Sequence, residues 1–99
     1  MKTFDIVDLT YFTGLTSIAF TYTNANVILL PNTVRTFTTT SFRYTSVGKL
    51  VAPYDGVISI PSGWHNSSSA TKVYVLDEYV NRYKPEGDAT FHPLSEFEM

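Results

Sequence analysis

The chain has 99 residues, a formal net charge of −2, 43% hydrophobic and 16% charged residues, and no cysteine. This length indicates one domain with a single core, and the missing cysteines exclude disulfides, thiolate metal sites and a cysteine nucleophile. Residues 1–84 carry a net charge of +2 and residues 85–99 carry −4, so neither part offers the clustered cations that nucleic-acid binding requires.

The first half of the chain reads as a series of β-strands. Residues 3–9 alternate apolar and polar side chains, and residues 17–23 do so more cleanly. Residues 27–30 form a short run that is apolar on both faces, as in a buried strand, after an Asn-Ala-Asn sequence that predicts a turn. Residues 33–47, rich in threonine and aromatic residues, predict one long bent strand or two strands, with a bulge near residues 39–41.

The centre of the chain predicts a hairpin. Two apolar runs flank residues 53–56 (Pro-Tyr-Asp-Gly), where proline presets the first turn angle and Asp-Gly tolerates the left-handed conformation. The second run, residues 57–60, ends at Pro-Ser-Gly, which places Trp64 in a loop. We expect an antiparallel pair of strands here, around which the remaining strands are arranged.

The last part of the chain is less regular. Residues 72–76 predict a further core strand, whereas residues 77–83 fit a helical turn and a strand equally well. The acidic segment 85–99 lacks a strand pattern, and it predicts an extended arm that docks on a neighbouring subunit. The predicted division is therefore a domain of residues 1–84 and a C-terminal arm of residues 85–99.

About seven short strands at this spacing, with no internal repeat in the sequence, predict an all-β fold. We expect an antiparallel β-sandwich of the jelly-roll or immunoglobulin-like type, with a small open barrel as the alternative. No apolar run approaches the ~20 residues of a membrane span, and Asp5 and Asp8 interrupt what would be the apolar part of a signal peptide. These features predict a protein that is neither secreted nor bound to a membrane.

The sequence offers no catalytic or metal-binding pattern. His65 and His92 are 27 positions apart, and the second lies in the irregular segment. Asp77 and Glu78 are adjacent, so in a strand their side chains would point to opposite faces. We therefore expect a protein that is not an enzyme and needs neither a metal nor a cofactor.

Recognition of another surface is the better prediction. Trp64, His65 and Asn66 together could stack and hydrogen-bond a sugar, although a single tryptophan in a small domain more often folds inward and covers the core. Tyrosines on strand faces are common in protein interfaces. The predicted contacts with neighbouring subunits are made by Tyr54, Tyr79 and Tyr83 and by Phe91, Leu94 and Phe97 of the arm. We expect a homo-oligomer, with a trimer as the first choice.

Residues 48–60 (GKLVAPYDGVISI) resemble a strand-turn-strand phrase found in jelly-roll heads of bacteriophage fibres and in complement-like and tumour-necrosis-factor-like trimeric domains. Together with 14 Thr, 9 Ser and the absence of cysteine, this resemblance implies a virion protein of a tailed bacteriophage, such as a capsid decoration, head-fibre or tail component. Such a protein would be made in the host cytoplasm and carried in the virion. The alternative function is a carbohydrate- or receptor-binding module that uses the Trp64 loop, and a cytoplasmic location is the alternative setting.

Overall fold

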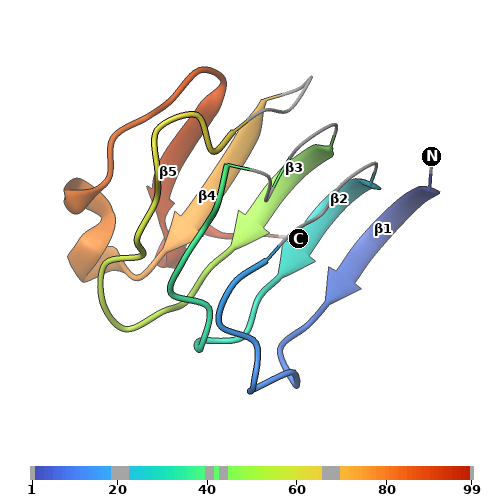
Figure 1. Ribbon diagram of the computed structural model, residues 1–99, viewed down its shortest axis with the longest axis horizontal. Helices are drawn as coiled ribbons and strands as arrows, with labels where there is room; N and C mark the ends of the chain where they lie inside the picture. The colour runs from blue at the N-terminus through green and yellow to red at the C-terminus, as the bar shows by residue number, and fades with distance from the viewer. Residues whose placement is uncertain (1, 19–22, 40–41, 43–44, 66–69, 99) are drawn as a thin grey trace.

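The computed structural model describes residues 2–18, 23–39, 42, 45–65 and 70–98. Five strands form one parallel sheet in the order of the sequence: β1 (Lys2–Asp8), β2 (Thr23–Leu29), β3 (Ser46–Val51), β4 (Thr71–Val75) and β5 (Ala89–Pro93). After each of the first four strands, a return segment leads back toward the start of the next: residues 9–18, 30–39, 52–65 and 76–88. The chain is therefore a β-solenoid of about four turns (Figure 1).

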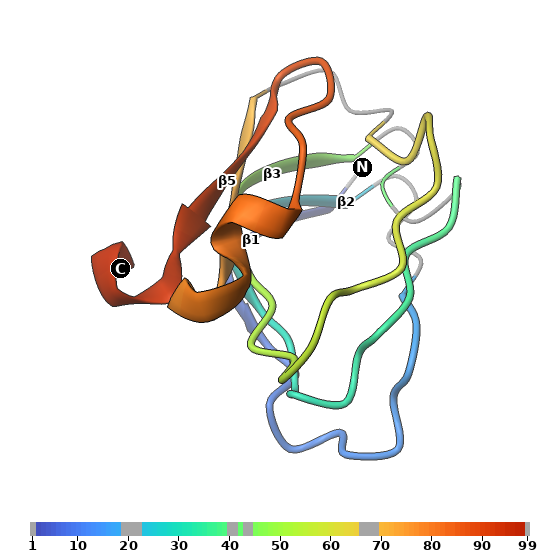
Figure 2. The ribbon, with the colours of Figure 1, turned by 90° about the vertical axis from the view of Figure 1, so that its left-hand side faces the viewer.

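Equivalent residues of successive coils stack into columns. One column faces the core and consists of Val7, Ile28, Leu50, Val73 and Phe91. Its three middle members are completely buried. Figure 2 shows the return segments on one side of the sheet, so the core lies between these segments and the sheet. Burial of the inward-facing apolar side chains of successive coils holds the coils together.

Proline marks the first corner of two coils. Ala25 pairs with Val47, 22 residues later, and the same offset relates Pro31 to Pro53. Each proline follows a buried residue, Leu30 or Ala52, at the end of a strand. Because proline cannot donate a ladder hydrogen bond, it ends the strand and turns the chain into the return segment.

The return side carries its own short parallel ladder, which we call the return ladder. Its rungs are Ser17, Thr36 and Ser59, one from each of the first three coils. The Ser59 amide donates to the Arg35 carbonyl oxygen at 2.9 Å, and the Phe37 amide donates to the Ser59 carbonyl oxygen at 2.9 Å. Residues 57–60 are therefore extended and pair with the coil below them.

The C-terminal segment crosses the outer face of the sheet, opposite the return segments (Figure 2). After β5 comes the short 3-10 helix η2 (Leu94–Glu96), whose Ser95 amide donates a hydrogen bond to Asp77 Oδ1 at 3.0 Å. The Phe97 ring then packs edge-on against Tyr74 with ring centres 5.1 Å apart. The Lys49 ammonium group donates to the Glu98 carbonyl oxygen, so the segment is tied to β3 as well.

The predicted fold class is wrong in its arrangement, although the chain is all-β. The five strands are parallel and form one sheet, so the chain is neither an antiparallel sandwich nor a small open barrel. The predicted hairpin is absent, because residues 57–60 pair in parallel with residues 35–37 and not with β3. Turn-forming residues at 53–56 suit the corner of a solenoid as well as a hairpin. The segment after residue 84 is not largely irregular either, since Ala89–Pro93 forms β5.

Several predicted elements correspond to observed ones. Predicted strands at residues 3–9, 27–30 and 72–76 match β1, β2 and β4, but the turn expected at residues 24–26 lies within β2. Asp77–Arg82 forms the 3-10 helix η1, which is the helical alternative for that stretch. The predicted strand at 17–23 and the predicted bulge at 39–41 fall partly outside the described residues.

Candidate functional site

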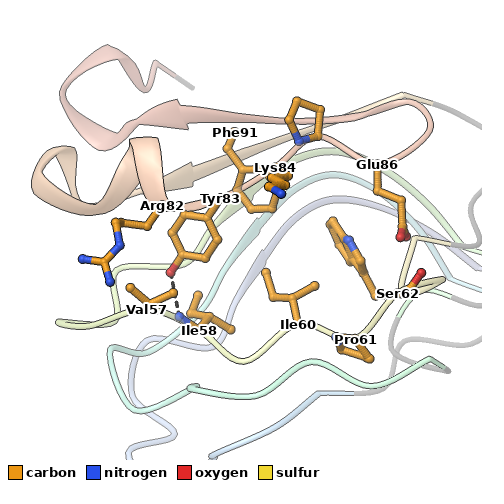
Figure 3. A pocket seen from close by; sticks show the side chains of 12 residues that line it. Val57, Ile58, Ile60, Pro61, Ser62, Arg82, Tyr83, Lys84, Glu86 and Phe91 are labelled. Atoms are coloured by element: carbon orange, nitrogen blue, oxygen red, sulfur yellow. Dashed lines mark hydrogen bonds between the residues drawn. The ribbon is translucent and has the colours of Figure 1, made fainter.

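A pocket of about 420 Å³ lies at the β5 end of the core, between the return segments 52–65 and 76–88 (Figure 3). We call it the coil-end pocket. Its walls are mainly apolar and aromatic, with two cations at the rim. The lining residues are Val57, Ile58, Ile60, Pro61, Ser62, Trp64, Arg82, Tyr83, Lys84, Pro85, Glu86 and Phe91.

The pocket exists because the fourth coil is short. Leu50 pairs with Val73, 23 residues later, whereas Val73 pairs with Phe91 after only 18 residues. Part of this shorter return segment, residues 76–88, forms the 3-10 helix η1 (Asp77–Arg82). No described residue of this segment therefore forms a fourth rung on the return ladder.

Tyr83 closes one end of the pocket. Its hydroxyl oxygen accepts a hydrogen bond from the Ile58 amide at 2.7 Å, and the hydroxyl group donates to the Gly56 carbonyl oxygen at 3.4 Å. The ring stacks on Phe91 with centres 4.8 Å apart and planes 10° apart. Burial raises the pKa of Tyr83, so the hydroxyl remains protonated and available as a donor.

Glu86 closes the other end. One carboxylate oxygen accepts a hydrogen bond from the Gly63 amide at 2.8 Å, and the other accepts one from the His65 amide at 3.4 Å. Figure 3 shows Tyr83 and Glu86 on opposite sides of the pocket with Ile60 between them. Both oxygens of this carboxylate are thus engaged by the protein's own backbone.

His65 links the third return segment to β4. The Thr71 hydroxyl donates to the Val47 carbonyl oxygen at 2.6 Å, so it must accept from His65 Nε2–H, which lies 2.8 Å away. Burial lowers the pKa of His65, while the nearby carboxylates of Asp88 and Glu86 oppose this shift. The pair therefore joins two coils. Because Thr71 is only 1% exposed, its hydroxyl is not accessible as a nucleophile.

Trp64, which the sequence offered as a candidate sugar-stacking residue, is only 2% exposed. Its ring centre lies 5.4 Å from those of Phe37 and Phe42 and 6.0 Å from that of Phe91. The ring therefore covers the core, as the alternative interpretation of this residue held. Asn66, the third residue of the predicted glycan site, lies outside the described residues.

The predicted interface residues are all half-buried, and most have contacts within their own subunit. Tyr54 packs against the core, and the Tyr79 hydroxyl donates to Asp55 Oδ1 at 2.9 Å. Tyr83 stacks on Phe91, and Phe97 packs against Tyr74, so three more of the predicted interface residues have ring contacts within the subunit. Contacts of these side chains with other subunits stay a prediction. The half-buried set is Tyr54, Tyr79, Tyr83, Phe91, Leu94 and Phe97.

The β1 end of the solenoid is open. Five large hydrophobic side chains are exposed among the described residues, and four of them belong to the first coil: Phe4 (41%), Ile6 (45%), Tyr11 (88%) and Phe12 (60%). The sheet ends at β1, so one edge of this seven-residue strand has no neighbouring strand among the described residues. Terminal coils of solenoids normally present a polar outer surface.

The β5 end is closed in three ways. Ala89 exchanges two hydrogen bonds with Glu86, of 3.2 and 2.9 Å, across a turn in which Gly87 adopts a φ of 55°. Pro93, the last residue of β5, has no amide hydrogen to offer to another strand. The helix η1 also lies at this end (Figure 2). The two ends of the solenoid therefore differ in their capacity to pair.

The described residues contain no group of three or more His, Cys, Asp or Glu side chains that could hold a metal ion. None of the helices in the described ranges is both long enough and apolar enough to cross a bilayer.

Sequence reasoning missed the rim cations Arg82 and Lys84, the role of Glu86 and the exposed first coil. The first coil had a visible signal, because the four large hydrophobic residues Phe4, Ile6, Tyr11 and Phe12 lie close together in the sequence. The coil-end pocket had no such signal in the sequence, because it depends on the length of the fourth coil. Comparison of the chain with protein-family models, curated proteins and solved structures finds no match.

Proposed function

We propose that this protein is a non-enzymatic assembly protein that joins a second copy of itself through the open edge of β1. The observation that carries the proposal is the free outer edge of the seven-residue strand β1, in a coil that exposes Phe4, Ile6, Tyr11 and Phe12. An unpaired strand edge presents a row of free amide and carbonyl groups, and a cluster of exposed apolar side chains favours burial against another surface.

A second copy is the proposed partner because only one end of the sheet is free to pair. The β5 edge is occupied by Glu86 at Ala89 and lacks a donor at Pro93, so stacking of β1 on β5 of another copy is disfavoured. Pairing of two β1 edges about a two-fold axis closes at two subunits. A dimer therefore replaces the trimer expected from the sequence.

The two carboxylates of β1 are compatible with this pairing. The Asp5 carboxylate accepts a hydrogen bond from Asn26 Nδ2 at 2.9 Å, so it is held by the neighbouring strand β2. Asp8 accepts hydrogen bonds from the Thr10 amide at 3.0 Å and the Thr10 hydroxyl at 2.6 Å. Both carboxylates thus have partners within the subunit.

A bacteriophage virion is the proposed setting of this assembly. Its support is the cysteine-free, threonine- and serine-rich composition. The segment 48–60 no longer adds to it, because the resemblance rested on a strand-turn-strand unit that the solenoid does not contain. A carbohydrate-binding role through Trp64 is not proposed, since this ring is buried.

Sedimentation velocity of the full chain over a range of concentrations tests the proposal. We expect a species of twice the 11.1 kDa chain mass at micromolar concentration. Ile6→Lys should weaken the dimer at least about tenfold, which corresponds to about 1.4 kcal/mol. Val57→Lys is the matched control, because Val57 is 42% exposed but lies in the third coil. A wild-type chain that is monomeric throughout, or an Ile6→Lys variant that dimerises normally, would contradict the proposal.

A further inference from the structure

We propose that the coil-end pocket binds an extended acidic peptide, which adds a fourth rung to the return ladder above Ser59. This site is separate from the β1 edge, so it goes beyond the proposed assembly function. Strand addition to an exposed ladder is a common mode of peptide recognition, in which backbone hydrogen bonds give affinity and side-chain pockets give specificity.

The backbone of residues 58–60 defines the position of the guest. The amide and carbonyl groups of Ser59 point to the second coil, where they bond Arg35 and Phe37. In an extended chain the groups of the two adjacent residues point the opposite way, which is toward the pocket. The hydrogen bond from the Ile58 amide to the Tyr83 hydroxyl has this direction (Figure 3).

Two groups on this edge are free to bind. Among the described residues, the Ile58 carbonyl oxygen and the Ile60 amide have no hydrogen-bond partner. They are the equivalents of the Arg35 carbonyl and the Phe37 amide, which hold Ser59 one coil below. A guest residue at the fourth rung would donate its amide to Ile58 and accept from the Ile60 amide.

The pocket also defines which side chains the guest should carry. On the return ladder, the rung residue Ser59 is exposed, while the flanking side chain of Ile58 is buried. The residues that flank the guest's rung would likewise point inward, over Ile60, Trp64 and Phe91. Aliphatic side chains on both sides of a polar residue fit this arrangement.

The charges at the rim favour an acidic guest. Arg82 and Lys84 are exposed, and neither forms an ion pair with a described residue. The nearby carboxylate of Glu86 already binds the Gly63 and His65 amides. The rim therefore carries two cations and one hydrogen-bonded carboxylate, which leaves it with a net positive charge, and complementary charge on the guest increases its association rate and specificity.

The probe is a fluorescein-labelled peptide, Glu-Glu-Ile-Ser-Ile-Glu-Glu, and its binding to the full chain is measured by fluorescence anisotropy. We expect saturable binding that weakens at least about tenfold when the glutamates are replaced by lysines or the isoleucines by serines. The double variant Arg82→Glu, Lys84→Glu should show the same loss. Lys72→Glu, which changes an exposed lysine in β4, should bind normally.

Two further measurements separate this site from the dimer and from unfolding. Ile6→Lys should bind the peptide like the wild type, because it lies at the opposite end of the solenoid. In nitrogen-15 NMR spectra, titration with the peptide should shift the Ile60 amide resonance more than that of Val27 in β2. Absence of binding, equal binding of the lysine peptide, or an unshifted Ile60 amide would each overturn the proposal.

Discussion

The Tyr83 hydroxyl accepts a hydrogen bond from the Ile58 amide at 2.7 Å, on the side of the return ladder where no described residue forms a further rung. The Tyr83 side chain thus supplies the hydrogen-bond acceptor that the backbone of a further coil would otherwise supply to Ile58. Because the same ring stacks on Phe91, Tyr83 connects the third return segment to β5. Removal of its hydroxyl group should therefore loosen the β5 end of the solenoid.

Tyr83→Phe should lower the free energy of unfolding by about 1–2 kcal/mol, because it leaves the Ile58 amide without its partner while the ring contact remains. Urea denaturation followed by circular dichroism measures this change. The matched control is Tyr79→Phe, whose hydroxyl bonds the exposed Asp55 side chain, and it should change stability by less than about 0.5 kcal/mol. Equal effects of the two variants would argue against the capping role of Tyr83.

Trp64→Ala should cost about 3–5 kcal/mol, because it removes a buried ring that contacts Phe37, Phe42 and Phe91. For a small domain this loss is a large share of the total stability. Val57→Ala, at a residue that is 42% exposed, is the control and should cost less than about 0.5 kcal/mol. A stable Trp64→Ala variant would show that the ring is not part of the core.

The strands of this protein are easier to predict from the sequence than their arrangement. The apolar runs at residues 27–30 and 72–76 indicate strands because burial requires them, whatever the sheet topology. One repeat in the sequence indicates the parallel arrangement. Residues 23–31 and residues 45–53 are 22 positions apart, and both segments begin with Thr and end with Pro. Only two copies are this similar, so the repeat is easily overlooked. The Pro-Tyr-Asp-Gly turn then favours the wrong, antiparallel interpretation.

The candidate sites differ in how far they could be predicted from the sequence. The inward position of Trp64 could be inferred, because a single tryptophan in a small domain is usually buried. The coil-end pocket could not, since it depends on the 18-residue spacing between Val73 and Phe91. The hydrogen bond between the Tyr83 hydroxyl and the Ile58 amide was not foreseen, and the predicted contact of Tyr83 with another subunit stays a prediction.

Gly48→Ala tests the parallel register of β2 and β3. A Cβ atom at Gly48 would lie 2.9 Å from the Asn26 carbonyl oxygen, so one of the two backbones must shift. We expect a loss of about 1–3 kcal/mol in the free energy of unfolding. Gly14→Ala is the control, because nothing lies within 4 Å of the added atom, and its stability should match that of the wild type. An unaffected Gly48→Ala variant would contradict the close approach of the two strands.

The stability of the fold should decrease as the pH falls below 6.5. Burial holds the pKa of His65 below its ordinary value of 6.5, so in this range the unfolded chain binds more protons than the folded chain. The stability that neutral His65 contributes is fully present above pH 6.5. It is lost progressively as the pH falls from 6.5 to the lowered pKa of the folded state. The measurement is urea denaturation between pH 8 and pH 5, in which the unfolding midpoint should fall toward the acid side.

His65→Gln should flatten this dependence, because glutamine can still donate to the Thr71 hydroxyl but does not titrate. The carboxylates of Asp8 and Asp77 have lowered pKa values, so the stability that they contribute is lost below their ordinary value of 3.8, outside this window. A His65→Gln variant with the wild-type pH profile would exclude His65 as the cause.

Cross-linking through introduced cysteines tests the assembly through β1 most directly, because the natural chain has no cysteine. Ile6→Cys places one thiol near the middle of β1, and Val57→Cys places one at a similarly exposed position in the third coil. Each variant is treated with a short bis-maleimide and analysed by denaturing electrophoresis. Pairing of two β1 edges predicts an efficient cross-linked dimer for Ile6→Cys and only background for Val57→Cys. Equal yields for both variants, or no dimer with Ile6→Cys, would contradict assembly through this edge.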